Sequence, residues 1–243
     1  MKVEKETNLD KVKEIAIAFL NLPLVETELG LAFVQHPFFS SAIIPVDKGG
    51  KYELSNILED EAAYIETLKK YRQHILEVTV IHNVWYMILP NYRLTFLKYI
   101  KESLSEKDFS ILLADAWITA ENPNGDPNVP LRTAISWFTQ ADKKSLMSEA
   151  DYKTWEALPD IFQIYRGVSV GRNPRGLSWT RNLGTAKWFA NRFNTKTQTG
   201  YIQTATILKN QALAYFNTRK EDELVVDTTK LDIRIWTDND TFK

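Results

Sequence analysis

The segment IFQIYRGVSVGRNPRGLSWT, residues 161–180, decides the fold class of this chain of 243 residues. It opens a series of short stretches rich in Ile, Val, Thr, Tyr and Trp, which alternate with turns rich in Gly, Asn, Lys and Arg. Such a series is typical of β-strands. The expected strands are Ile161–Tyr165, Gly176–Thr180, Tyr201–Leu208, Glu221–Asp227 and Ile233–Thr237, with a short helix at Leu183–Phe193.

The chain before Pro159 has a different, helical pattern. Apolar residues recur at helical spacing from Leu9 to Leu20, and Pro23 ends this first helix. Residues 25–54 are irregular and aromatic-rich, with a turn at Gly49-Gly50. Two further helices are expected within residues 55–89, and another from an N-cap at Asn91 to about Glu102. Three more are expected at residues 105–120, 131–140 and 143–158. The stretch ENPNGDPNVP, residues 121–130, is expected to be a loop.

Together these patterns predict an α+β protein. A mainly helical region, residues 1–158, would precede a compact β-rich region, residues 159–243. The aromatic residues of the helical region follow helical spacings and are expected to belong to the core, among them Trp85, Tyr86, Trp117, Trp137 and Phe138.

The composition excludes several kinds of site. Hydrophobic residues make up 44% of the chain and charged residues 25%, which are values of a globular protein. The absence of cysteine excludes disulfides, thiolate metal sites and cysteine nucleophiles, and it suits a cytoplasmic setting. His74 and His82 lie eight residues apart with no evident third ligand, so no metal site is expected.

The sequence gives no sign of a targeting or membrane-spanning segment. Residues 1–10 are charged and lack the apolar stretch of a signal peptide. No apolar run reaches the length that spans a bilayer. We therefore expect a cytoplasmic protein, or one delivered into the cytoplasm of a target cell, that has no membrane partner.

The charges are distributed unevenly along the chain. Residues 161–220 contain ten Lys or Arg and no Asp or Glu, although the whole chain has a net charge of −1. Such a stretch favours an anionic partner, either a phosphate-bearing ligand or a nucleic acid. A solvated positive face without any partner is the alternative.

Two pairs of polar residues on the expected strands are candidates for chemistry. Alternate residues of a strand share a face, so Ser178 would point the same way as Thr180, and Glu221 the same way as Glu223. Two carboxylates that lie close together repel each other unless a cation, a hydroxyl or a substrate offsets the repulsion. A nearby arginine and a serine hydroxyl would provide that offset.

Four short motifs occur in order within residues 161–237. They are Tyr165-Arg166-Gly167, Ser178-Trp179-Thr180, Ala186-Lys187-Trp188-Phe189 and Glu221-Asp222-Glu223. With these motifs the sequence resembles the mono-ADP-ribosyltransferases, in the branch defined by an arginine, a serine motif and a Glu-x-Glu pair. The resemblance implies a split β-sandwich of short strands with one or two helices, on which the helical N-terminal region packs.

The resemblance implies transfer of ADP-ribose from NAD, a substrate here, to an acceptor, with release of nicotinamide and no metal. By this resemblance Glu223 would bond a hydroxyl of the nicotinamide ribose and stabilise the positive charge that develops on it. Glu221 would orient the acceptor and take up its proton. Ser178 would hold Glu223 in place.

The resemblance also implies roles in binding NAD and the acceptor. Arg166 would contact the phosphates or the ribose, and Thr180 would belong to the same NAD site. The backbone of Gly167 would lie against the nicotinamide amide, and Phe193 would stack on its ring. The loop at about 215–220 would present an aromatic residue to the acceptor, with Phe216 as the candidate and Tyr215 as the other option.

The identity of the acceptor is left with alternatives. In this branch a Glu at the first position of the pair goes with arginine as acceptor, so Glu221 favours a protein arginine. A nucleic acid base is the second option, because aromatic residues are interleaved with the basic residues of 161–220. A non-catalytic module that binds a partner through this basic face is the third. Activities of this family are often toxic to the cell that carries them, so an inhibitor protein is an expected partner.

Each candidate residue also has a purely structural interpretation. Arg166 could form a salt bridge with Asp160 or Asp227. Ser178 and Thr180 could be ordinary strand residues. The two glutamates could be solvated charges at a sheet edge, where they discourage aggregation of strands.

Overall fold

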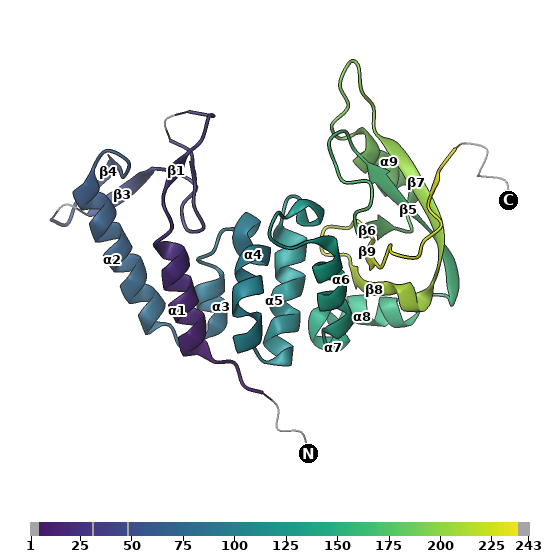
Figure 1. Ribbon diagram of the computed structural model, residues 1–243, viewed down its shortest axis with the longest axis horizontal. Coiled ribbons are helices and arrows are strands. Elements are labelled where there is room, and N and C mark those ends of the chain that lie inside the picture. The colour runs from purple at the N-terminus through teal and green to yellow at the C-terminus, as the bar shows by residue number, and fades with distance from the viewer. Residues whose placement is uncertain (1–4, 31, 48, 238–243) are drawn as a thin grey trace. The chain divides into compact units, whose positions relative to one another are not determined.

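The computed structural model describes residues 5–30, 32–47 and 49–237, and it divides the chain into two compact units (Figure 1). The first unit runs to Ser105 and also takes in Thr119–Glu121, and the second comprises Glu106–Ile118 and the chain from Asn122 onward. The composition changes near residue 158, but the compact units divide near residue 105. The helices between these two points belong to the same unit as the large sheet.

The first unit is built mainly on four helices. α1 (Leu9–Leu20) contacts α2 (Glu61–Glu77), α3 (Ile81–Trp85) and α4 (Pro90–Ile100), and a 3₁₀ turn, Lys101–Ser103, follows α4. Asn8 caps α1 by accepting a hydrogen bond from the backbone N–H of Lys11 at 3.0 Å. The predicted first helix and the predicted pair of helices within 55–89 are confirmed.

The prediction of Asn91 as a helix cap is wrong. α4 begins at Pro90, and its N-cap residue is Leu89, two positions before the predicted cap. Proline suits the first position of a helix because its missing N–H would have no partner there and its φ is already helical.

Residues 25–54 are less irregular than predicted. β1 (Val25–Glu26) pairs with β2 (Val34–Gln35), and β3 (Ile43–Asp47) pairs with β4 (Tyr52–Asn56), in both cases antiparallel. The turn of the second hairpin contains the expected glycines, Gly49 and Gly50, whose φ angles of 71° and 90° favour glycine. Each strand of this hairpin buries one residue, so the sequence carries no clear alternation of apolar and polar positions.

The second unit contains a six-stranded antiparallel sheet in the order β10-β7-β5-β6-β9-β8. All five predicted strands occur in it, and the prediction of an α+β protein is confirmed. β8, which the sequence did not predict, forms the edge beside β9. The strands are β5 (Ile161–Val168), β6 (Ser178–Thr180), β7 (Tyr201–Leu208), β8 (Ala212–Phe216), β9 (Glu223–Val226) and β10 (Arg234–Ile235).

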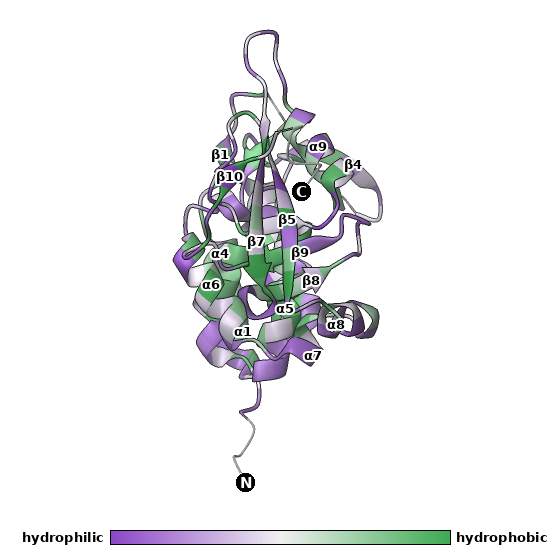
Figure 2. Ribbon diagram, turned by 90° about the vertical axis from the view of Figure 1, so that its right-hand side faces the viewer, coloured by the Kyte–Doolittle hydropathy of each residue, from purple (hydrophilic) through white to green (hydrophobic). Residues whose placement is uncertain are grey.

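Helices before and within the strand region pack on this sheet. α9 (Leu183–Asn191) lies against β5 and β7, while the short helices near residues 131–156 contact β8 (Figure 2). Two of these contacts are hydrogen bonds of 2.8 Å, from the Trp155 indole to Ala212 O and from Lys143 Nζ to Leu213 O. The helices are α5 (Glu106–Thr119), α6 (Leu131–Gln140), α7 (Lys143–Leu146) and α8 (Glu149–Glu156), and a 3₁₀ turn, Pro123–Gly125, lies in the predicted loop.

The packing explains why the units divide near residue 105. Every residue of β8 and β9 is buried, so these strands need apolar cover. Side chains of the preceding helices provide it, as in the contact of Phe138 with Phe216, whose ring centroids are 6.3 Å apart. Figure 2 shows hydrophobic stretches in β7 as well. In the described part of the chain, no helix combines the length and apolar character that crossing a membrane requires.

Candidate active site

The two candidate glutamates lie at the junction of β8 and β9. Glu223 is the first residue of β9, and Glu221 lies in the preceding turn. Lys220 and Asp222, on either side of Glu221, have φ angles of 58° and 50° and are the non-glycine residues with positive φ in the described ranges. Such conformations cost about 1–3 kcal/mol and concentrate at functional sites. The backbone strain therefore brackets Glu221.

Arg219 brings the two carboxylates together. Its Nη2 lies 2.9 Å from Oε2 of Glu221 and 3.5 Å from Oε2 of Glu223. The sequence predicted the pairing from strand alternation, but Glu221 is outside the strand, so the turn and Arg219 produce it instead. A cation does offset the repulsion, as expected, and it is Arg219.

Glu223 is also held by a tryptophan from helix α5. The indole Nε1 of Trp117 donates to Oε1 of Glu223 at 3.0 Å, and both side chains are buried. The Trp117 ring packs edge-on against Phe138, with centroids 5.0 Å apart. A charge-assisted hydrogen bond to a buried carboxylate fixes its orientation. The prediction that Trp117 belongs to the core is confirmed, while the same prediction for Tyr86 is wrong, since Tyr86 is 61% exposed. The hydrogen bond of the Trp117 indole was missed because nothing in the sequence marks its partner.

Ser178 does not hold Glu223 in this structure. Its hydroxyl accepts a hydrogen bond of 3.0 Å from Asn124, and its strand partner is Val225. Asn124 also accepts from the backbone N–H of Leu177 at 2.5 Å, so the loop before α6 is tied to β6. The positioning role expected of Ser178 is carried by Trp117.

Thr180 lies directly opposite Glu223 on the neighbouring strand and fastens the turn. Its buried hydroxyl donates to the carbonyl of Glu221 at 3.0 Å and accepts from the N–H of Asn182 at 3.0 Å. The structure thus gives Thr180 a role in fixing the backbone beside the acidic pair.

Arg166 is a buried clamp between β5 and the segment that leads into β6. Its guanidinium donates to the carbonyl of Ser178 at 2.5 Å and to that of Asn173 at 3.0 Å, and not to Asp160 or Asp227. A Cβ at Gly176 would lie 2.1 Å from Nη2 of Arg166, so glycine there leaves room for the clamp. Its Nε is buried without a hydrogen-bond partner.

The charge of Arg166 survives this burial. Loss of solvent lowers the pKa of Arg166 to about 10, while the negative charge of Glu223 acts in the opposite direction. The guanidinium therefore remains protonated at neutral pH. It adds positive potential near the acidic pair although its Nη1 and Nη2 groups are directed at main-chain carbonyls.

Gly167 allows helix α9 to approach the sheet. A Cβ at this position would lie 2.2 Å from the carbonyl oxygen of Ala186 and 2.5 Å from the nitrogen of Ala190. Both alanines are completely or almost completely buried. Two of the quoted motifs, the Arg-Gly pair and the helix beginning at Ala186, therefore meet in one close contact, which provides a packing reason for glycine.

The aromatic residues expected to face an acceptor are buried. Tyr215 and Phe216 belong to β8 and are 4% and 3% exposed, so the prediction that either projects from a loop is wrong. The expected loop is shorter because the strand runs on through Phe216. Phe216 instead lines a small hollow with Ile118, Thr218, Arg219 and the two glutamates.

Burial and charge act together on Glu221. Its pKa is raised, mainly by burial and further by the negative charge of Glu223, while Arg219 and the charge of Arg192 act to lower it. A carboxylate with a raised pKa is a better proton acceptor than an exposed one. The raised pKa makes Glu221 a stronger base than an ordinary exposed glutamate.

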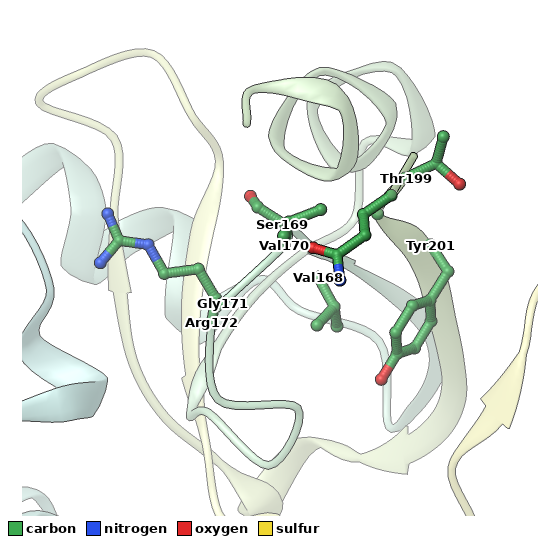
Figure 3. A pocket seen from close by; sticks show the side chains of 9 residues that line it. Val168, Ser169, Val170, Gly171, Arg172, Thr199 and Tyr201 are labelled. Atoms are coloured by element: carbon green, nitrogen blue, oxygen red, sulfur yellow. The ribbon is translucent and has the colours of Figure 1, made fainter. Parts of the chain in front are cut away.

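A larger pocket follows the Arg-Gly pair along the chain. It has a volume of about 380 Å³ and is formed by the segments 168–172 and 198–201, at the end of β5 and the start of β7 (Figure 3). Arg172 extends from this pocket on the side away from Tyr201 (Figure 3). The volume lies within the range of small-molecule sites.

Phe193 is partly exposed beside this pocket-forming loop. The guanidinium carbons of Arg172 and Arg192 lie 5.1 and 5.0 Å from its ring centroid. These are cation–π distances. The aromatic ring and the positive charges of the acid-free stretch therefore occur together, as the sequence pattern suggested.

Among the residues that the structure describes, no group of three or more His, Asp or Glu side chains could hold a metal ion.

None of the protein-family models, curated proteins or solved structures compared with the chain matches it.

Proposed function

We propose that the chain is a mono-ADP-ribosyltransferase that transfers ADP-ribose from NAD to a protein arginine and releases nicotinamide, on a split β-sandwich of that family. The observation that carries the proposal is the state of Glu223, a buried carboxylate held by Trp117 at 3.0 Å and neighboured by Glu221 through Arg219. The ordered motifs of residues 161–237 support the same proposal.

Glu223 stabilises positive charge on the nicotinamide ribose as the bond to nicotinamide breaks. The carboxylate is already oriented by the indole of Trp117, so it does not have to reorganise during the reaction. Its Oε2 faces Arg219 at 3.5 Å, a contact that a ribose hydroxyl can replace. The buried setting strengthens the interaction between this carboxylate and the developing charge.

Glu221 acts on the acceptor. Its carboxylate already binds one guanidinium, that of Arg219, at 2.9 Å, which is the contact that an acceptor arginine needs. Its raised pKa favours uptake of the proton that the guanidinium loses when the new bond forms. The strained turn holds this carboxylate at a fixed position beside Glu223.

The residues available for NAD fit its charge. The pocket of about 380 Å³ lies in the acid-free stretch, and Arg172 lines it. Arg166, which is buried but keeps its charge, adds to the positive potential of this stretch. The diphosphate of NAD would be attracted by this positive potential.

The proposal is tested by measuring nicotinamide release and transfer of labelled ADP-ribose into a cell lysate. E223Q should lower both by about 10²–10³-fold, the size of effect seen when one electrostatic stabiliser is removed. E221Q should abolish transfer while leaving nicotinamide release to water. D232N, which removes an exposed carboxylate paired with Arg234, is the matched control and should behave as wild type. Wild-type protein that does not consume NAD, or E223Q that equals wild type, would contradict the proposal.

A nucleic acid base is the second candidate acceptor. Trp188 is 58% exposed and Phe193 38%, and the guanidinium of Arg192 lies 5.5 and 5.0 Å from their ring centroids. Exposed rings among basic side chains are typical of surfaces that bind single-stranded nucleic acid. Treatment of the labelled lysate with protease or nuclease separates the two acceptors. Label removed by nuclease alone, with strong salt dependence, would favour this candidate.

A further inference from the structure

The β3–β4 hairpin of the first unit, which lies at the N-terminal end of α2 in Figure 1, has one covered face and one open face. Alternate residues of a strand point to opposite faces, and residues paired across two strands point to the same face. Val46 and Ser55 lie on the covered face and are buried, and Ser55 Oγ donates to the carboxylate of Asp60 at 2.9 Å. The other face, here named the open face, carries Ile43, Pro45, Asp47, Tyr52 and Leu54.

The open face is mostly apolar although it is exposed. Tyr52 is 77% exposed and Leu54 76%, and Pro45, which lies directly opposite Leu54, is exposed as well. Antiparallel sheets with one face in water usually carry polar side chains on that face. Apolar side chains gathered on an exposed surface mark places where another molecule binds. The open face therefore has the character of a docking surface.

The charge around this hairpin identifies the kind of partner. Residues 25–61 contain seven Asp or Glu and two Lys, so this stretch is acidic whereas residues 161–220 are basic. One of the acids, Asp47, lies on the open face directly opposite Tyr52. Negative charge repels nucleic acids and anionic membranes and attracts basic proteins. A partner that fits the open face carries positive charges together with apolar side chains.

We propose that the open face binds the protein acceptor of the transferase, through a basic segment of the acceptor that also carries apolar residues. This inference rests on the proposed function, because an acceptor that is modified at arginine brings positive charge with it. It assigns a docking site to the first unit, outside residues 161–237, which contain the four motifs.

Docking affects large and small acceptors differently. A protein held at the open face has its arginines at a raised local concentration around the same chain. This lowers KM for the protein acceptor. Free arginine is too small to gain from docking, because it carries no apolar segment. The open face therefore changes the preference among acceptors and not the chemical step.

Binding is measured first, without NAD, by fluorescence anisotropy of a labelled peptide of alternating arginine and leucine. Y52T/L54T should weaken binding about tenfold or more, because tyrosine is among the side chains that contribute most to interfaces. D47N keeps the side-chain oxygen that accepts from the N–H of Gly50 at 2.7 Å and removes only the charge, so it should weaken binding about two- to fivefold.

The controls match these variants in chemistry and exposure. L208T replaces a leucine of β7 that is 50% exposed in the second unit, and D232N removes an exposed carboxylate there. Both should bind the peptide as wild type does. A peptide of alternating glutamate and leucine should not bind. Thermal unfolding shows which variants remain folded, and D47N alone tests the inference if Y52T/L54T does not fold.

Transfer of labelled ADP-ribose is then compared between the arginine–leucine peptide and free arginine. Y52T/L54T should raise KM for the peptide about tenfold and leave kcat/KM for free arginine unchanged. A purely structural role of the open face would change both acceptors alike. That result would overturn the inference.

The outcomes separate this inference from the proposed function. Transfer to free arginine with equal peptide binding by wild type, Y52T/L54T and D47N overturns the inference and leaves the transferase function in place. Peptide binding that Y52T/L54T weakens, in a protein that consumes no NAD, overturns the transferase function and supports only the docking site for a basic segment. Self-association in light scattering that Y52T/L54T abolishes would place a second copy on the open face and overturn the inference.

Discussion

Trp117 and Glu223 are joined by a hydrogen bond of 3.0 Å although they are 106 residues apart in the sequence. The bond links the last turns of α5 to the first residue of β9. Arg219 makes a second link to the same helix through the carbonyl of Ile118. The candidate catalytic carboxylate is therefore positioned by the helices as well as by the sheet.

Replacement of Trp117 by phenylalanine should lower kcat for nicotinamide release and leave KM for NAD nearly unchanged. Hydrogen bonds to charged groups are worth about 1.5–3 kcal/mol, which corresponds to a loss of about 10- to 150-fold if the bond acts fully in the transition state. W155F is the control, because the Trp155 indole donates to a main-chain carbonyl, Ala212 O, at 2.8 Å. A W117F enzyme with wild-type kcat would show that the bond does not position Glu223.

Transfer to an acceptor should lose rate at low pH as Glu221 becomes protonated. Because burial raises the pKa of Glu221, the acid limb should lie above the ordinary value of 4.5. The measurement is the pH profile of transfer to agmatine, a small guanidine compound, with nicotinamide release followed in the same samples. The E221Q variant is expected to retain nicotinamide release, and the rate of this release should show no such loss at low pH. A limb at or below the ordinary value would contradict a raised pKa.

Stability should increase with pH above about 8 because of Lys143. Burial lowers the pKa of Lys143 from 10.5 to about 8, while Asp142 acts in the opposite direction. Between these two pH values the unfolded chain binds more protons than the folded one, so the free energy of unfolding rises with pH. Urea unfolding at several pH values measures this slope. K143M should reduce it, and K153M, at an exposed position, should not.

Alanine at position 167 should lower the free energy of unfolding and disturb the packing of α9 against β5 beside the site. The added Cβ would meet Ala186 O at 2.2 Å, and overpacking of this kind costs about 1–3 kcal/mol. G184A is the control, since its Cβ would meet only the Asn182 side chain, at 3.0 Å. A G167A protein of normal stability but raised KM for NAD would contradict the packing explanation and favour direct contact with nicotinamide.

The sequence predicted those elements whose pattern is local. The helix Leu9–Leu20 and the strand Tyr201–Leu208 have the predicted bounds, because caps, prolines and periodic apolar residues act within a few positions. β8 was missed because its sequence, ALAYF, is a short apolar run without alternation. Such a run does not distinguish a buried strand from other buried segments.

The sequence predicted which residues form the acidic pair of the candidate site, but it did not predict their contacts. Glu221 and Glu223 do lie together, yet the cation between them is Arg219 and the donor to Glu223 is Trp117. Arg166 was expected to contact the phosphates or the ribose of NAD, but its guanidinium donates to main-chain carbonyls. These differences arise from tertiary packing between distant segments, for which a single sequence carries no local signal.

The division of the chain near Ser105 also determines which part could be moved to another protein as a portable module. A fragment cut where the composition changes, at residue 159, would lack α5–α8 and leave the buried residues of β8 uncovered. It would expose an apolar strand edge of the kind that recruits other chains into aggregates. A fusion that begins before Glu106 would keep the Trp117 side chain and the acidic pair together.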